Sequence, residues 1–284
     1  MSDFYLIATP IGNLSDISRR AVEVLKSVDL VLAEDTRRTA ILTKNYEIDV
    51  PLMSLHGHNE RYRISAVLEM LDKGKNVALV SDAGTPALSD PGEHLVDSVI
   101  AAGHKLSPIP GASAILAALV ASGFPCVPFS FYGFVPRKGK PRSRTLSRLI
   151  GSSETAVFFE SPKRLVTLLA DLIRSGQEKR KLVVAREMTK IHEEFVRGTV
   201  SEVLEYFTAT QVRGEITLVL SPREKEKGEL RKDVIAAEIL SEGYLRQGLS
   251  SSDVARQGSE VLEISKNKAY EIVHSVMDKE EEST

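Results

Sequence analysis

Short apolar runs alternate with amphipathic segments along most of the chain. Apolar runs bounded by turn residues predict buried strands, and apolar residues spaced three and four apart predict helices. Strands are predicted at 4–9, 30–33, 76–81, 105–109, 129–134, 156–159, 182–185 and 216–220. Helices are predicted at 17–27, 61–73, 91–102, 112–122 and 162–174. Strands separated by helices favour parallel βα units, so the predicted fold class is α/β.

The pattern restarts after Gly123–Pro125, and the charge balance changes near residue 224. Residues 1–223 hold 28 Lys and Arg against 25 Asp and Glu, whereas residues 224–284 hold 9 against 14. The charged stretch 221–228 is typical of a linker. Beyond it the sequence predicts helices at 230–242, 250–257 and 266–278, the last entered like a helix-turn-helix. We therefore expect an α/β domain at 1–118, a second at 119–224 and a helical extension at 225–284.

Composition excludes several classes of protein. With 42% hydrophobic residues among 284, the chain has enough apolar material for a folded core. The net charge of −2 excludes a globally basic nucleic-acid binder but leaves local basic patches open. The single cysteine, Cys126, excludes an intramolecular disulfide and a cysteine-based zinc site. The sequence shows no membrane-length apolar run and no basic signal-peptide region, so we expect a cytoplasmic protein without a membrane partner.

Loops rich in glycine and proline follow three of the predicted strands. They are Thr9–Leu14, Ser81–Gly92 and Pro110–Ala114. The carboxyl ends of parallel strands meet at one edge of a sheet, and ligands bind there. Glycine permits a close approach of the backbone, and proline stiffens the loop. Three such loops at one edge favour a binding site over three ordinary turns.

Several common motifs are absent from the sequence. It contains no G-x-G-x-x-G, no G-x-x-x-x-G-K-[ST] and no G-x-S-x-G, which argues against a dinucleotide fold, a P-loop and a hydrolase elbow. His56 and His58 are possible metal ligands, but no third ligand stands at a suitable spacing. We therefore expect no metal site.

Four segments resemble the tetrapyrrole methylase family: Ala33–Arg37, Ser81–Gly92, Phe158–Arg164 and Arg186–Glu194. The resemblance covers about residues 4–222 and is strongest to members that methylate ribosomal RNA. It implies two α/β domains around a cleft, with a helical extension. It also implies S-adenosylmethionine as methyl donor, a homodimer, and 2′-O-methylation of a cytidine ribose in small-subunit ribosomal RNA.

The resemblance further implies which residues form the site. The implied cofactor-binding residues are Pro10, Gly12, Ser81, Asp82, Thr85, Ser113, Ala114, Met188, Thr189, Ile216 and Thr217. A general base would help a ribose hydroxyl to react, and the candidates are Glu34, Asp35, His56, Glu160 and Glu187. We prefer Glu160 and Glu187 as catalytic residues because both follow predicted strands. Structural ion pairing is the competing interpretation, with Arg37 or Arg186 as partner or, for Glu160, with Lys163 or Arg164.

Residues 137–148 contain six Lys and Arg and no acidic residue. Phe131, Tyr132 and Phe134 stand just before them. Cations bind phosphates, and aromatic side chains stack on unpaired bases. The candidate RNA-binding residues are Arg137, Lys138, Lys140, Arg142 and Arg144. A solvated loop over core aromatics is the alternative.

Two other functions stay open on the sequence. A tetrapyrrole C-methyltransferase of the same fold would need a roomy apolar cleft and no basic stretch. A DNA-binding regulator could act through the C-terminal helices, although the excess of acids in residues 224–284 argues against strong DNA binding. For the methylation of ribosomal RNA, the expected partner is either free small-subunit ribosomal RNA or the assembled 30S subunit.

Overall fold

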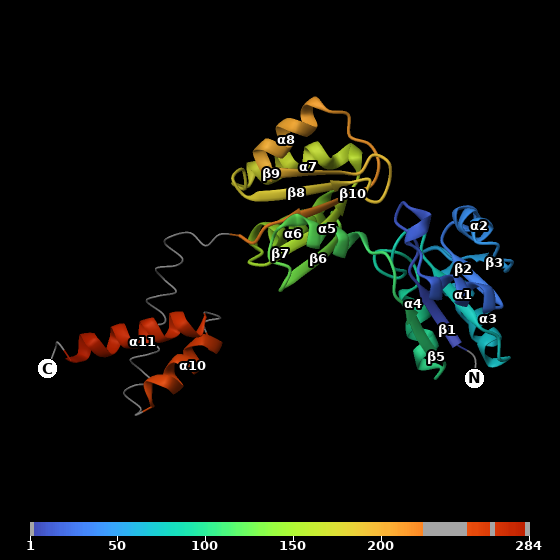
Figure 1. Cartoon of the computed structure of the whole chain (residues 1–284), viewed down its shortest axis with the longest axis horizontal. Helices are drawn as coiled ribbons and strands as arrows, with labels where there is room; N and C mark the ends of the chain where they lie inside the picture. The colour runs from blue at the N-terminus through green and yellow to red at the C-terminus, as the bar shows by residue number, and fades with distance from the viewer. Residues whose placement is uncertain (1–2, 224–248, 262–264, 282–284) are drawn as a thin grey trace. The chain divides into compact units, whose positions relative to one another are not determined.

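The computed structural model describes residues 3–223, 249–261 and 265–281 (Figure 1). The chain divides into two compact units, Met1–Arg223 and Glu224–Thr284, which are described separately. The first unit contains two five-stranded sheets. The predicted α/β class is thereby confirmed.

The first sheet is entirely parallel, in the order β3-β2-β4-β1-β5. Its strands are β1 (Asp3–Ile7), β2 (Leu30–Ala33), β3 (Leu52–Ser54), β4 (Val77–Val80) and β5 (Lys105–Ile109). Every residue of β2 and β4 is buried. Strands covered on both faces read as continuous apolar runs, which explains why they were predictable.

Helices cover both faces of this sheet. They are α1 (Arg19–Ser27), α2 (Thr36–Asn45), α3 (Glu60–Asp72) and α4 (Glu93–Ala101). Leu25 of α1 packs with Val31 on one face. Leu71 of α3 and Leu95 of α4 pack with Leu32 on the other. Successive residues of one strand thus belong to separate cores, as the alternation of side chains along a strand requires.

The second sheet is mixed, in the order β6-β7-β10-β8-β9. Its strands are β6 (Phe129–Phe134), β7 (Thr155–Glu160), β8 (Lys181–Arg186), β9 (Glu194–Thr199) and β10 (Ile216–Leu220). Only the β6–β7 pair is parallel, and the other pairs are antiparallel. The expected parallel βα pattern therefore holds for the first sheet and for this pair. A short loop is enough to join antiparallel β8 and β9, so no crossover helix is needed.

Helices also cover both faces of the second sheet. They are α5 (Ala114–Ser122), α6 (Gly139–Gly151), α7 (Pro162–Arg174) and α8 (Val200–Ala209). Leu119 of α5 packs with Val157 and Val219 on one face. On the other face the four leucines of α7 are fully buried with Phe158. The predicted apolar stripe of α7 is thus confirmed.

The strands and α-helices of the first unit that were not predicted are α2, β3, α6, β9 and α8. The basic helix α6 buries only Leu149 fully, so its apolar signal is weak. In α2 the polar residues Thr39 and Thr43 are buried with Leu42, and the Asp35 side chain caps the helix by accepting a hydrogen bond from Arg37 N. Such elements depend on capping and tertiary contacts more than on apolar periodicity.

In the second unit the described helices are α10 (Ser251–Val261) and α11 (Lys266–Glu281). They pack through Val254 and Ala255 of α10 against Ala269 and Val273 of α11. The predicted helix at 230–242 lies outside the described residues. The predicted domain boundary at 118/119 stays a prediction. In the described part of the chain, every helix is too short or too polar to cross a membrane.

The side chain of Arg180 links the end of α6 to the end of β10. Its guanidinium donates to the carbonyls of Leu149 (3.0 Å), Ile150 (2.9 Å), Ser152 (3.1 Å) and Ser221 (2.8 Å). Burial lowers the pKa of Arg180 to about 10, so it remains charged near neutral pH. Four carbonyls from two chain segments, 149–152 and Ser221, therefore depend on one cation.

We predict that Arg180→Met lowers the free energy of unfolding by about 2–4 kcal/mol, because these carbonyls lose a charged donor. Equilibrium urea unfolding measures the change. The matched control is Arg19→Met, which removes an exposed pair with Glu23 and should leave the midpoint unaltered. Equal midpoints for both variants would contradict the assigned role.

Candidate functional site

The loops that follow β1 and β4 are joined at the carboxyl edge of the first sheet. Thr9 N donates to Gly84 O (2.9 Å), and Gly84 N donates to Thr9 O (3.0 Å). The Thr9 hydroxyl donates to Ser81 O (2.9 Å). Gly84 has a φ of +84°, a conformation that side chains disfavour. Two predicted ligand loops therefore form one structure, because their parent strands are neighbours.

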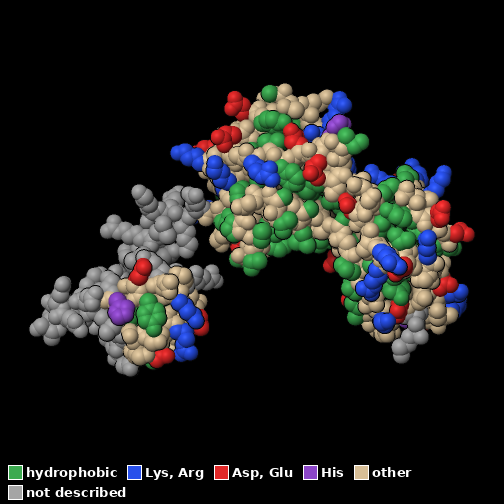
Figure 2. Space-filling model, in the orientation of Figure 1, with side chains coloured by type: hydrophobic (Ala, Val, Ile, Leu, Met, Phe, Trp, Pro, Cys, Tyr) green, Lys and Arg blue, Asp and Glu red, His purple; other side chains and the backbone are tan. Residues whose placement is uncertain are grey.

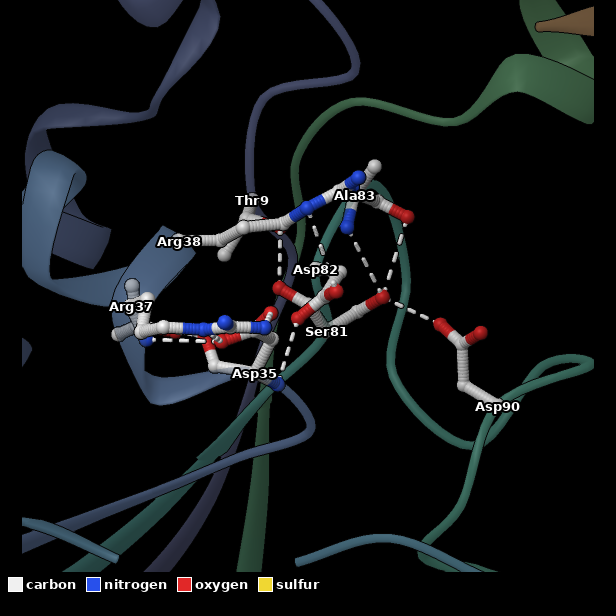
Figure 3. Close-up of polar contacts among 9 residues, drawn as sticks. Thr9, Asp35, Arg37, Arg38, Ser81, Asp82, Ala83 and Asp90 are labelled. Carbon is white, nitrogen blue, oxygen red and sulfur yellow. Dashed lines mark hydrogen bonds and ion pairs between the residues drawn. The ribbon is translucent and has the colours of Figure 1, made fainter. Parts of the chain in front are cut away.

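Polar contacts hold the beginning of the Ser81–Gly92 loop (Figure 3). The Ser81 hydroxyl accepts a hydrogen bond from Ala83 N (3.2 Å) and contacts the Asp90 carboxylate. Asp82 Oδ1 accepts a hydrogen bond from Asp35 N (2.9 Å). These bonds connect the loop after β4 to the loop after β2. Both carboxylates are therefore held at this sheet edge by the backbone and by a hydroxyl.

Acidic side chains outnumber basic ones around these loops. Burial raises the pKa of Glu34, and the nearby charges of Asp90 and Asp82 raise it further. Burial also raises the pKa of Asp90, with a smaller contribution from Asp82, while its contact with Ser81 opposes the shift. Arg38 is the nearby cation, with its Nε 3.7 Å from Asp82 Oδ2. Raised carboxyl pKa values mean that a bound cation would relieve unfavourable charge.

A cavity of about 360 Å³ lies in the first unit, lined by loops that follow strands of the first sheet and by residues of β6, β7 and β10 of the second. Its volume is in the range of small-molecule sites. The predicted residues that line it are Ser81, Asp82, Thr85, Ser113, Ala114, Glu160, Ile216 and Thr217. The structure thus brings together residues that lie far apart in the sequence. Most of its remaining wall is apolar, including Ile11 and Phe159.

A second cavity of about 320 Å³ adjoins the first and shares Ser81 and Asp82 with it. Pro10 and Gly12 line this second cavity. A Cβ added at Gly12 would lie 2.6 Å from Thr189 Oγ1 and 2.8 Å from Met188 O. Gly12 is therefore required for the close packing of the β1 loop on the loop after β8.

The loop after β8 contains three predicted site residues, Glu187, Met188 and Thr189. None of the three lines either cavity. Met188 is buried among apolar side chains. Thr189 accepts a hydrogen bond from Asn13 N (3.0 Å). Glu187 pairs with Lys190 (2.8 Å) and accepts a hydrogen bond from Glu215 N (2.8 Å). In the structure these three residues position loops.

Glu160 stands at the carboxyl end of β7 with a side chain that is 0% exposed, and it lines the first cavity. Its Oε1 accepts a hydrogen bond from Ser161 N (2.7 Å) and pairs with Arg164. Among the described residues, Oε2 has no hydrogen-bond partner. Burial raises the pKa of Glu160, against the opposing effects of the Ser161 amide and Arg164. Glu160 thus combines the predicted ion pair with a free acceptor atom.

The basic stretch 137–148 forms the entrance and body of α6. Arg137, Lys138, Lys140 and Arg144 are exposed. Arg142 differs, because its side chain is only 13% exposed, pairs with Asp171 and donates to Pro136 O (3.1 Å). The structure gives Arg142 an intramolecular role. Four of the five candidate RNA-binding side chains are left available to solvent.

Arg38, Leu88, Asp90 and Phe134 line the first cavity but were not assigned to it from sequence. Asp90 lies within the Ser81–Gly92 loop, so the loop itself was the available signal. Leu88 and Phe134 are exposed apolar residues. The exposure of a side chain is a property of the folded chain, and an apolar residue type in the sequence does not reveal it.

A metal site is not formed by the part of the chain that the structure describes, where no group of three His, Cys, Asp or Glu is suitably placed. His56 and His58 contact each other edge to face, with ring centroids 6.1 Å apart. Two imidazoles alone fall short of the three protein ligands of a catalytic zinc site.

Comparison with known proteins gives the family. Residues 3–204 match the family described as Tetrapyrrole (Corrin/Porphyrin) Methylases. The chain is 41% identical to the ribosomal RNA small subunit methyltransferase I of Synechocystis, over 96% of this chain and 97% of that protein. It is 47% identical to the protein of the same name from Thermotoga maritima, over 79% of this chain and all of that protein.

Solved structures with the same fold have more distant sequences. The uroporphyrin-III C-methyltransferase of Thermus thermophilus, solved with S-adenosylhomocysteine, is 18% identical and matches 78% of this chain and 97% of that chain, with a TM-score of 0.55. This likeness shows the shared fold, while the family match and the sequence relatives carry the assignment. The chain therefore belongs to the tetrapyrrole methylase family of S-adenosylmethionine-dependent methyltransferases, with the ribosomal RNA small subunit methyltransferase I proteins as its relatives.

Proposed function

We propose that this chain transfers the methyl group of S-adenosylmethionine to the ribose 2′-hydroxyl of a cytidine in small-subunit ribosomal RNA. The names of the sequence relatives support the RNA substrate. The observation that carries the proposal is the cavity to which both sheets contribute, with carboxylates on its wall and exposed cations on the nearby helix α6. A positively charged donor and a negatively charged acceptor need these two kinds of surface.

The chemistry of the cavity fits the donor. The carboxylates of Asp82 and Asp90 belong to its wall, and much of the remaining lining is apolar. A sulfonium ion is favoured by such carboxylates, and an adenosine group is favoured by apolar walls. We assign cofactor binding to three groups of residues that line this cavity. They are Ser81, Asp82 and Thr85 in the loop after β4, Ser113 and Ala114 at the start of α5, and Ile216 and Thr217 of β10.

The remaining assigned residues serve the same site indirectly. Pro10 and Gly12 line the adjoining cavity, while Met188 and Thr189 hold the loop that packs on Gly12. We propose that these four residues fix the distance between the two sheets' loops. Correct spacing matters because methyl transfer requires the donor and acceptor atoms to be aligned.

When bound, S-adenosylmethionine supplies a methyl group that is already activated by its positively charged sulfur. In the proposed step, the ribose oxygen forms a bond to the methyl carbon as the carbon–sulfur bond breaks. The bonding electron pair passes to sulfur, which leaves a neutral thioether. The hydroxyl proton goes to Glu160 Oε2, the acceptor that has no other partner among the described residues. Of the two catalytic candidates, the proposal rests on Glu160, because Glu187 lies outside the cavity.

On the face shown in Figure 2, basic and acidic side chains are interspersed over the described surface. RNA binding must therefore rely on local groups such as Arg137, Lys138, Lys140 and Arg144. The relatives favour an RNA substrate over the tetrapyrrole alternative. We propose that the partner is small-subunit RNA, free or in the 30S subunit, and that the enzyme acts in the cytoplasm.

We also propose that the chain forms a homodimer. Leu116 and Val120 lie one turn apart on α5 and are exposed, as is Val127. Exposed apolar residues that gather on one surface are typical of interfaces. Light scattering of the purified chain tests this proposal, and a monomeric mass would contradict it.

The central experiment is transfer of a radiolabelled methyl group to 30S subunits and to free small-subunit RNA, with mapping of the modified nucleotide. The proposal expects label on a cytidine 2′-oxygen. Label on a base, on a porphyrinogen or on neither RNA substrate would overturn it.

We predict that Asp82→Asn weakens binding of S-adenosylmethionine about tenfold, because one charge facing the sulfonium is lost. The amide oxygen still accepts the hydrogen bond from Asp35 N. Binding of S-adenosylhomocysteine, whose sulfur is neutral, should change much less. Isothermal titration calorimetry measures both ligands, with the exposed Asp97→Asn as control. Equal losses for the two ligands would contradict the electrostatic role.

We predict that Glu160→Gln lowers kcat about 100-fold or more, while the dissociation constant of S-adenosylmethionine changes less than about twofold. In the wild type, kcat should rise with pH through the raised pKa of Glu160 and level off above it, because the base form is the active one. The variant should lose this rise. An unchanged pH profile would show that Glu160 acts only through its pair with Arg164, and exposed Glu205→Gln serves as control.

A further inference from the structure

A third cavity opens beside the proposed cofactor site. Its lining residues are Phe134, Val135, Pro136, Arg137, Ser161, Lys163 and Arg164. Phe134 and Ser161 also line the first cavity, so the two cavities adjoin each other. Of its lining residues, Arg137 is already a candidate RNA-binding residue and Arg164 pairs with Glu160.

Strand order explains why these residues meet. β6 and β7 form the parallel pair of the second sheet, with Phe134 opposite Phe159. Their carboxyl ends therefore lie at the same edge of the sheet. The residues after β6 reach Arg137, and those after β7 begin α7 at Pro162. Two segments about 25 residues apart thus form one wall.

The cations of this cavity differ in their partners. Arg164 pairs with Glu160, donates to Val135 O (2.9 Å) and donates to Ser161 Oγ (3.1 Å). Arg137 and Lys163 are exposed, and neither forms an ion pair with an acid of the described residues. Arg164 is thus neutralised by a buried carboxylate, whereas Arg137 and Lys163 contribute uncompensated positive charge. Such a pair is suited to an anion.

Phe134 provides a flat apolar surface where the two cavities join. Its ring packs against Phe159 at 5.2 Å between centroids, yet the residue is 56% exposed. By contrast, Tyr132 is covered by Arg148, whose guanidinium lies 5.5 Å from the ring centroid. An aromatic ring supported from behind and open in front is suited to stacking on a nucleobase.

We propose that the third cavity holds the nucleotide that is methylated, with a backbone phosphate between Arg137 and Lys163 and the base stacked on Phe134. The inference rests on the proposed function, since it needs an RNA acceptor. A 2′-hydroxyl and the 3′-phosphate belong to the same ribose, so a phosphate in this cavity keeps the hydroxyl close to Glu160 in the neighbouring one. Glu160 and Lys163 are separated by only three positions across the β7–α7 junction.

The test compares Arg137→Ala and Lys163→Ala with Lys179→Ala, an exposed lysine that precedes β8 and lies outside all three cavities. Binding to 30S subunits and to an oligocytidylate is measured over a series of salt concentrations. Each of the two variants should lower the salt slope, and the double variant should lower it by about 0.7, the value for one lost phosphate contact on a single strand. Their dissociation constants for S-adenosylmethionine should match the wild type.

A base-stacking role has its own readout. Phe134→Ala should raise KM for 30S subunits about tenfold, and Phe134→Tyr should restore it. Failure of the tyrosine variant to restore KM would overturn the stacking assignment. Weaker S-adenosylmethionine binding in the Arg137 or Lys163 variant would instead assign these cations to the methionine carboxylate.

Failure of the inference is distinguishable from failure of the proposed function. If the wild type transfers no methyl group to 30S subunits or free RNA, the proposed function fails. If the wild type is active and the Arg137 and Lys163 variants keep the salt slope of Lys179→Ala, only the nucleotide site fails. Inhibition by polyglutamate but not by oligocytidylate would assign the cavity to an acidic peptide and overturn the proposal.

Discussion

The site depends on the parallel pairing of β1 with β4 at the centre of the first sheet. This pairing places the loops after the two strands side by side, and the reciprocal bonds between Thr9 and Gly84 lock them together. Ser81 and Asp82 then take positions fixed by backbone groups and by the Asp35 amide. Neither loop alone contains the site. The carboxylates line the cavity because the sheet places β1 beside its central strand, β4.

The second sheet contributes to the same cavity through a different topology. Its parallel pair, β6 and β7, directs Phe134 and Glu160 to one edge, while antiparallel β10 begins at that edge with Ile216 opposite Glu160. The end of β7 and the beginning of β10 therefore supply neighbouring residues at this edge of the sheet. At this edge the mixed sheet presents both the carboxyl ends and the amino ends of strands. The parallel first sheet presents only the carboxyl ends of its strands to the site.

Charge is separated over short distances in the first unit. Asp82 and Asp90 line the first cavity, and Arg137 and Lys163 line the third. Between them the buried pair of Glu160 and Arg164 is neutral overall when both groups are ionised. A cationic donor and an anionic acceptor would thus meet opposite surfaces while their reacting atoms approach. The chain's small net charge conceals this separation.

The amino-acid sequence by itself determined the buried strands and the amphipathic helices, because Leu30–Ala33 and the leucine stripe of α7 are apolar at the spacing their elements require. It also indicated the Ser81–Gly92 loop, since glycine and proline are concentrated there. Polar or basic elements such as α2 and α6 escaped prediction, because capping and tertiary contacts stabilise them. Only the tertiary structure decided that Arg142 is paired with Asp171 while Phe134 is exposed beside the cavity. The ion-pair partner of a side chain and its exposure to solvent depend on residues far apart in the chain. Local sequence patterns therefore cannot reveal them.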